Sequence, residues 1–278
     1  MGPRKLLVFD LETVPDVALA RRLWPEAEGL DDAAVTELIL TKHKAQSSTG
    51  SDFPRPSFHK IVAVGCLLAD VEVTDGQESY HLRRLGCIGE EGDDERTLLE
   101  RWLEFGAREP LRLISFNGRG FDLPVIKLRA LHHGLPAGWL FQRGDKWSNY
   151  TSRYDQIWHV DMADTLTDFG AARSMPKLDE VCTLANLPGK LDLDGSRVCD
   201  LFAGGKVNEI RDYCETDVLN TYLLYLKYQV LTGALAPEML YQEVDVVKTM
   251  LTKEGPQKPH LQQFLEAWNT AERKDDPR

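Results

Sequence analysis

Three acidic motifs occur in this chain in a fixed order, and each lies beside a predicted strand or helix. They are Asp10-Leu11-Glu12 after the apolar run 6–9, Asp122 at the end of the segment 117–122, and the segment 213–217, which begins with Tyr213 and ends with Asp217. Carboxylate oxygens are the ligands that Mg²⁺ and Mn²⁺ prefer. The motifs therefore predict a cluster of four carboxylates that holds two divalent ions.

The predicted secondary structure explains how the four acids would meet. Side chains alternate between the two faces of a strand, so Asp10 and Glu12 would project from the same face. Asp122 begins a predicted helix just after a strand, and Asp217 lies within another predicted helix, so both would reach the same edge of the sheet. Without cations, four such carboxylates would repel one another. We therefore expect the site to depend on metal.

Tyr213 precedes Asp217 by one helical turn, so its hydroxyl and the carboxylate would share one face of the helix. Two divalent ions about 3.5–4 Å apart activate a water and stabilise the leaving oxygen in phosphodiester hydrolysis. With an unperturbed pKa near 10, a tyrosine is better suited to orient the attacking water than to remove its proton. The expected catalytic residues are Asp10, Glu12, Asp122, Tyr213 and Asp217.

The apolar patterns predict an α/β fold. Strands are expected at 6–9, 61–69, 79–85, 111–116 and 158–162, with a turn around Asp75-Gly76 between the second and the third. Helices are expected at 93–108, at 121–133 and from 177 onward, where 207–231 is the strongest, and 17–44 is weakly amphipathic. The order is typical of a ribonuclease H-like mixed sheet, with three antiparallel strands and then parallel strands, flanked by helices.

The length and composition predict one domain. With 278 residues, of which 42% are apolar, the chain is long enough to bury a large core. We expect a single domain over residues 1–250, a flexible insertion near 45–58 that is polar and broken by Gly and Pro, and a helical or frayed tail over 251–278. No apolar stretch approaches the roughly 18 residues of a membrane span, and the first residues are unlike a signal peptide. These features predict a soluble, cytoplasmic protein with no membrane contact.

The cysteines and the net charge argue against several classes of protein. The five cysteines are widely spaced and form no C-x-x-C pair, so we expect reduced thiols rather than disulfides or a zinc site. A net charge of −11 argues against a protein that coats nucleic acid by bulk electrostatics.

The segment 118–153 interleaves aromatic and basic residues. The aromatic residues are Phe121, Trp139, Phe141, Trp147 and Tyr150, and the basic ones are Arg119, Lys127, Arg129, Arg143, Lys146 and Arg153. Such a mixture suits the stacking of single-stranded bases along a phosphate chain, and it equally suits an ordinary surface loop with a few core aromatics. For Asp161, at the end of a predicted strand, we expect a structural or helix-capping role rather than an outer-shell role near the metals.

With these motifs, the chain resembles the DEDD superfamily of 3′-5′ exonucleases, in its tyrosine branch. It is most similar to the bacterial family of predicted 3′-5′ exonucleases related to the proofreading domain of family B DNA polymerases. The resemblance rests on the segments 8–16 and 115–124, on Asp194-Gly195-Ser196 with Val198, and on the segment 213–217, and it extends from about residue 5 to 230. The position four residues before Asp217 is Tyr213, which fits the tyrosine branch rather than the histidine branch.

The resemblance implies a set of functional residues and partners. The implied ligands of two Mg²⁺ or Mn²⁺ ions are Asp10, Glu12, Asp122 and Asp217. The expected substrate-binding residues are Asn117 and Phe121, which match motif positions that contact the terminal nucleotide, together with Leu11, Thr13 and Lys190. The expected partner is the 3′ end of single-stranded DNA or RNA. No polymerase domain is expected, because the chain ends about 60 residues after the last motif.

Three functional hypotheses follow. The first is an exonuclease that releases nucleoside 5′-monophosphates from the 3′ end of a single strand by a two-metal-ion mechanism. The second is a non-catalytic nucleic-acid or protein-binding module that retains the exonuclease fold, which the acidic net charge favours. The third is an endonuclease on the same fold, which the spacing of Tyr213 and Asp217 disfavours.

Overall fold

The computed structural model describes residues 2–172, 174–191 and 197–274. Its elements in chain order are β1 (Lys5–Pro15), α1 (Val17–Leu23), η1 (Pro25–Ala27), α2 (Asp32–Gln46), η2 (Pro56–Phe58), β2 (His59–Thr74), β3 (Gln77–Cys87), α3 (Glu95–Arg108), β4 (Leu111–Ser115), α4 (Asp122–His133), α5 (Trp139–Gln142), β5 (His159–Asp161), α6 (Met162–Leu166), α7 (Leu178–Leu184), α8 (Val198–Ala203), α9 (Val207–Thr232), α10 (Pro237–Glu254) and α11 (Pro259–Lys274).

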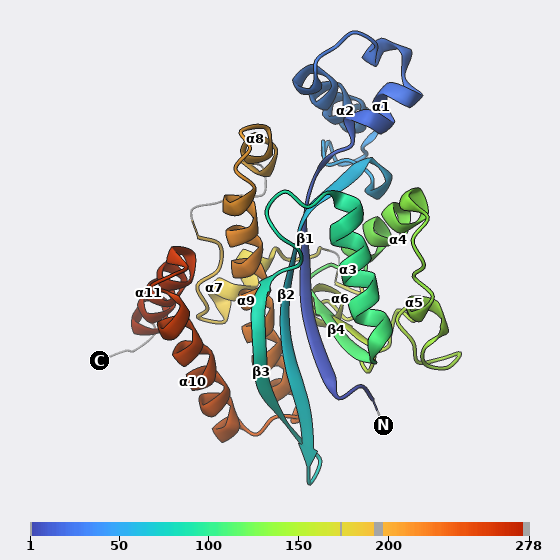
Figure 1. Ribbon diagram of the computed structural model, residues 1–278. Coiled ribbons are helices and arrows are strands. Elements are labelled where there is room, and N and C mark those ends of the chain that lie inside the picture. Colours follow the sequence, from blue (N-terminus) through green and yellow to red (C-terminus); the bar gives the residue numbers. More distant parts are fainter. Residues whose placement is uncertain (1, 173, 192–196, 275–278) are drawn as a thin grey trace.

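In the described chain, five strands form one mixed sheet in the order β3-β2-β1-β4-β5 (Figure 1). β1, β2 and β3 pair antiparallel, and β4 and β5 continue the sheet in parallel with β1. The turn at Asp75-Gly76 joins β2 to β3, and both residues have positive φ angles, of 53° and 82°, as a tight hairpin turn requires. The expected ribonuclease H-like α/β fold is confirmed.

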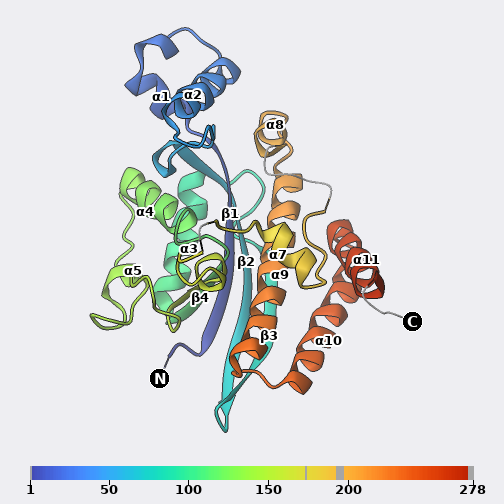
Figure 2. The same cartoon turned by 180° about the vertical axis from the view of Figure 1, so that it is seen from behind.

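Helices cover both faces of the sheet because β1 is apolar on both faces. Leu6 and Val8 pack with α9, α10 and α11 in one core cluster. The alternate residues Leu7 and Phe9 pack with α3 and α4 in another. Viewed from behind, α9 and α10 lie on one side of β1 and β2, and α3 and α4 lie on the other (Figure 2).

The stretch 17–44 forms two helices, α1 and α2, that extend beyond one end of the sheet (Figure 1). Pro25 and Gly29, which has a φ of 76°, lie between them and cannot continue a helix without cost. α2 begins at Asp31, whose carboxylate accepts a hydrogen bond from the Ala34 N–H at 2.8 Å. Residues 47–55, which connect α2 to η2, have no regular secondary structure.

The C-terminal helices α10 and α11 pack against α9. Leu261, Phe264 and Trp268 of α11 are fully buried in the same core cluster as α9. The chain before and within α11 also reaches the third acidic motif, since Lys258 Nζ and His260 Nε2 lie 3.0 and 2.9 Å from the Glu215 carboxylate. The cysteines are all free thiols, of which Cys182 and Cys214 are buried.

Across the described residues, no helix combines the length and the apolar character that crossing a membrane would require.

Candidate active site

The first pair of acids lies where β1 outruns its parallel neighbour. β4 pairs with β1 only as far as Val8, whereas β2 pairs with β1 as far as Pro15. From Phe9 onward, β1 therefore has an open edge on the β4 side. Asp10 and Glu12 lie on this stretch, and the register with β2 shifts between Glu12 and Thr13, so the strand bends directly after the acids.

Asp122 accepts a hydrogen bond from the open edge of β1. It is the first residue of α4, and its Oδ1 accepts a hydrogen bond from the Leu11 N–H at 3.0 Å. That N–H belongs to the residue between Asp10 and Glu12, so the hydrogen bond fixes the third acid beside the first two.

The loop before α4 is held by a carboxylate from β5. Asp161 accepts hydrogen bonds from the N–H groups of Asn117 and Arg119 at 2.8 and 2.7 Å, and it also caps α6. Asn117 has a φ of 63°, and at Gly118 a Cβ would lie only 2.4 Å from Ser115 Oγ. Gly118 therefore allows the tight turn that places Asp122. The structural role expected for Asp161 is confirmed.

The fourth acid comes from α9. Tyr213 and Asp217 lie one turn apart on this helix, and both are buried. Lys190 Nζ donates a hydrogen bond to the Tyr213 hydroxyl at 2.6 Å. The helix approaches the sheet closely at Gly65, where a Cβ would lie 2.8 Å from Cys214 Sγ.

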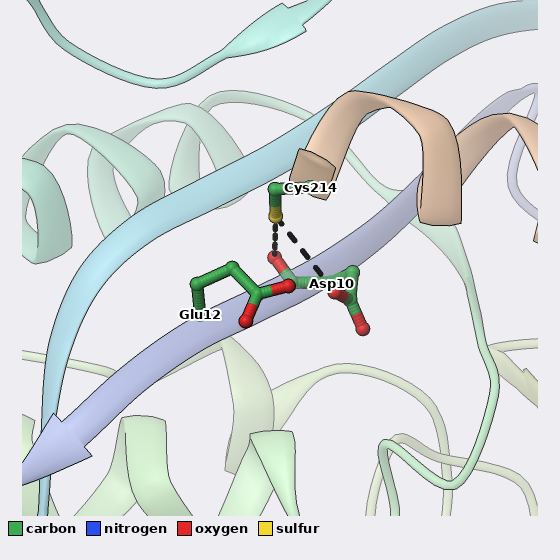
Figure 3. Close-up of side chains that lie close together, drawn as sticks. All are labelled: Asp10, Glu12 and Cys214. Atoms are coloured by element: carbon green, nitrogen blue, oxygen red, sulfur yellow. Dashed lines mark hydrogen bonds between the residues drawn. The ribbon is translucent and has the colours of Figure 1, made fainter. Parts of the chain in front are cut away.

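Cys214 is the residue at the centre of this contact. Its Sγ accepts a hydrogen bond from the Gly65 N–H at 3.2 Å and lies 3.5 Å from the Asp10 carbonyl oxygen. Asp10, Glu12 and Cys214 have potential ligand atoms within 4.8 Å of one another (Figure 3). Because Mg²⁺ and Mn²⁺ prefer oxygen to sulfur, the Cys214 thiol is suited to helix packing, and the Asp10 and Glu12 carboxylates are the groups suited to such cations.

The four carboxylates disfavour one another's charge. Burial raises the pKa of Asp10 well above its ordinary value, and the charges of Asp122 and Asp217 raise it further. Burial and the charge of Asp10 do the same to the pKa of Glu12. Burial raises the pKa of Asp122 to about 7 and, against the opposing charge of Lys190, that of Asp217 to about 6. Such a cluster is stabilised in its charged form by cations from outside the chain.

The donor set fits hard divalent cations. Asp217 Oδ1 is buried and has no hydrogen-bond partner among the described residues, although a buried acceptor is normally satisfied. The other donors are carboxylates whose charge is compensated only in part by Lys190. A divalent cation would supply both the missing partner and the missing charge.

The expected substrate-binding residues lie in different surroundings. The Leu11 side chain is buried in the core on the α4 face, so only its backbone faces the acids. Thr13 donates to or accepts from His59 Nδ1 at 2.8 Å, and the half-buried Phe121 ring packs on the His59 ring. Lys190 lies beside Tyr213, as described above, and the half-buried Asn117 lies in the turn before Asp122. Residues 192–196, which include the expected Asp194-Gly195-Ser196 motif, lie outside the described residues.

Most of the aromatic and basic residues of the segment 118–153 have structural partners. Trp139 and Tyr150 are buried in the core. Arg143 donates to the carbonyl oxygens of Gly106 and Glu109 at the end of α3. Phe141 and Trp147 are the exposed aromatic residues of this group. Core packing thus accounts for much of the pattern.

The residues that support the site differ in whether the sequence could reveal them. His59 and Gly65 lie on β2, far from the motifs in sequence, and their roles depend on strand register. His260 is remote in sequence from Glu215, yet the two hydrogen-bond. Cys214 lies inside the third motif, so its position beside Tyr213 was a usable signal.

A cavity of about 700 Å³ is lined by residues of α1, β2, α3 and α4 and by Phe202 and Val207. Its lining includes Asp16, Glu95 and Arg129 and none of the four clustered carboxylates. Size alone therefore does not identify the active site here.

Comparison with protein families gives a match over most of the chain. The profile of a family described as predicted 3′-5′ exonucleases related to the exonuclease domain of PolB matches residues 51–268. The match begins after Asp10 and Glu12. Among solved structures, the family B DNA polymerase from the hyperthermophilic archaeon Pyrobaculum calidifontis aligns with a TM-score of 0.45 and 17% identity, over 82% of this chain and 25% of the polymerase chain. No curated protein matches significantly.

Proposed function

Because the chain belongs to the family of predicted 3′-5′ exonucleases related to the exonuclease domain of PolB, we propose that it hydrolyses single-stranded nucleic acid from the 3′ end. The products are nucleoside 5′-monophosphates. The observation that carries this proposal is the convergence of four carboxylates from β1, α4 and α9, of which Glu12, Asp122 and Asp217 are buried and Asp10 is half-buried. The charge of Lys190 lowers the pKa values of Asp10, Glu12 and Asp217.

Asp10, Glu12, Asp122 and Asp217 would hold two Mg²⁺ or Mn²⁺ ions. When bound, such ions acidify a water and stabilise negative charge on the phosphodiester oxygens. The chain itself fixes the ligand positions: the Leu11 N–H orients Asp122, and the packing of Cys214 on Gly65 sets the depth of α9.

Tyr213 orients the attacking water. Burial and the charge of Asp217 raise the pKa of its hydroxyl far above the ordinary value of 10, so the group keeps its proton at neutral pH and does not act as a base. Lys190 donates a hydrogen bond to the Tyr213 hydroxyl oxygen. The hydroxyl proton is not used by this contact, so it can be donated to a second acceptor. Lys190 also brings a positive charge to a site that must accept a phosphate chain.

The test is digestion of single-stranded DNA and RNA oligonucleotides that are labelled at the 5′ or the 3′ end, in Mg²⁺, Mn²⁺ or EDTA. We expect a ladder from 5′-labelled strands, early release of labelled mononucleotide from 3′-labelled strands, and no product in EDTA. Covalently closed single-stranded circles should remain intact.

Two results would contradict the proposal in different ways. Cleavage of the circles would identify an endonuclease on this fold. Binding of oligonucleotides by well-folded protein without any product in either metal would favour the non-catalytic binding module.

A further inference from the structure

The segment between α2 and β2 carries an exposed aromatic ring beside the active site. Phe53 is 60% exposed. Its ring centroid lies 5.1 Å from that of Phe121 and 4.9 Å from that of His59. An aromatic ring that is packed on two others and still exposed has one side available to a ligand.

A hydrogen-bonded chain fixes this segment to β1. His59 is buried, and burial lowers its pKa, so the ring is neutral and carries one proton. His59 Nε2 lies 3.0 Å from the Pro54 carbonyl oxygen, which can only accept, so the proton is on Nε2. Nδ1 therefore accepts from the Thr13 hydroxyl at 2.8 Å.

The contacts of this segment reach β1 and the start of α4, in each case one residue from a carboxylate of the site. Thr13 follows Glu12 on β1, and Phe121 precedes Asp122 at the start of α4. η2 also packs against α4. Phe53 is thus held in place relative to the cation ligands, although its own segment has no regular secondary structure.

The geometry points to Phe53 as a substrate-positioning residue whose ring, together with Phe121, stacks on an unpaired nucleobase within one nucleotide of the scissile phosphate. This inference rests on the proposed nuclease function and adds a stacking surface that belongs to the 47–56 segment. Every base has a π face, so such a surface accepts all bases but requires them to be unpaired. It favours single strands over duplex ends and does not read the 2′-hydroxyl.

The first experiment compares steady-state digestion of a single-stranded oligonucleotide by wild type and F53A. Losing one base–aromatic stack should raise KM about tenfold and leave kcat within about twofold, and F53W should restore KM. Because the Phe53 ring is largely exposed, F53A should unfold at the wild-type temperature. The matched control is Y241A, which removes a 74% exposed ring on α10 and should leave KM unchanged.

The second experiment removes the base instead of the ring. An abasic site is placed in turn at each of the last three positions of the oligonucleotide. In wild type, the abasic site at one of these positions should raise KM about tenfold. In F53A, the abasic site at that same position should leave KM unchanged. An unchanged KM in F53A, or effects of F53A and the abasic site that multiply, would overturn the inference while leaving the nuclease function intact.

A binding measurement separates this inference from the proposed function. Fluorescence anisotropy with a labelled single strand compares D10N with the double variant D10N/F53A, so no turnover is needed. A roughly tenfold weaker Kd for the double variant supports the stacking role, even if wild type proves to have no nuclease activity. Equal Kd values overturn it.

Discussion

Two buried charge clusters flank β1, and they are built in opposite ways. On the α9 face, acids from β1, α4 and α9 raise one another's pKa values. On the α3 and α4 side, Arg129 pairs with both Glu95 and Asp16. Although burial raises the pKa of Asp16, hydrogen bonds from the Leu19 N–H and from Arg129 hold it below its ordinary value.

The two clusters differ in whether their carboxylates are paired with cations of the chain. In the Arg129 cluster both carboxylates are paired with a cation of the chain, and removing one partner of a buried ion pair strongly destabilises a fold. The carboxylate cluster lacks that compensation, so it destabilises the metal-free fold and gains from cations supplied by solvent. On the proposed function, the unpaired acids serve the active site and the paired acids stabilise the fold.

The largest expected effect is the loss of turnover when a carboxylate of the first cluster is neutralised. D10N and D217N should each reduce kcat by at least roughly 10³-fold, because each removes charge from the cation site. The matched control is E215Q, in the same motif as Asp217 but bonded to Lys258 and His260. Single-turnover digestion should show near-normal rates for E215Q; a comparable loss in E215Q would mean that the effect is not specific to the carboxylate cluster.

A large stability effect is expected at Arg129 instead. R129M leaves two buried carboxylates without their cation and should lower the free energy of unfolding by about 3–5 kcal/mol. Urea denaturation measures this loss. The folded fraction should retain kcat within about twofold, whereas a stable R129M protein with no activity would contradict the separation of the clusters.

The pH dependence of metal-free stability should expose the unpaired cluster. Asp122 and Asp217 have folded pKa values of about 7 and 6, above their unfolded values near 3.9. Their protonated forms therefore favour the folded state at low pH, and this stability is lost as pH rises through about 6–7. Thermal unfolding in EDTA should show a Tm that falls between pH 5 and pH 8, and D122N should weaken the trend. Adding Mg²⁺ should raise Tm most at pH 8; a Tm that rises with pH in EDTA would contradict this assignment.

The smallest effect is expected at the contact between α9 and α11. Burial opposes the charge of His260, yet the carboxylates of Asp212 and Glu215, 3.1 and 2.9 Å from its two ring nitrogens, raise its pKa to about 9. Its stabilisation is present below the unfolded pKa near 6.5 and is lost as pH rises through about 9. H260Q should lower the free energy of unfolding by about 1 kcal/mol at pH 6 and by less at pH 10. An equal loss at both pH values would show that shape, rather than charge, governs this contact.

The sequence predicted the sheet and the acids because both depend on local patterns. The apolar run 6–9 followed by Asp10 and Glu12 indicates a strand that ends on a site, and the segment 117–122 indicates a strand, a turn and a helix. The extension of β1 to Pro15 was not predicted, because it depends on pairing with β2 over its whole length.

The supporting residues depend on contacts between distant segments. The hydrogen bond from the Leu11 N–H to Asp122 requires that β4 ends before β1 does, which no local pattern reveals. The Thr13–His59–Pro54 chain depends on the β1–β2 register in the same way. The basic and aromatic segment 118–153 shows the converse error, since composition alone does not distinguish core residues such as Trp139 and Tyr150 from a surface that binds nucleic acid.

We predict that Asp10, Glu12, Asp122 and Asp217 together bind two divalent ions. Equilibrium titration with Mn²⁺, in which free ion is counted by electron paramagnetic resonance, tests it without any substrate. We predict two Mn²⁺ ions per wild-type chain, fewer in D10N and D217N, and the wild-type number in E215Q. Wild-type protein that binds no Mn²⁺, or D10N and D217N variants that bind as many ions as wild type, would contradict a two-ion site at these carboxylates.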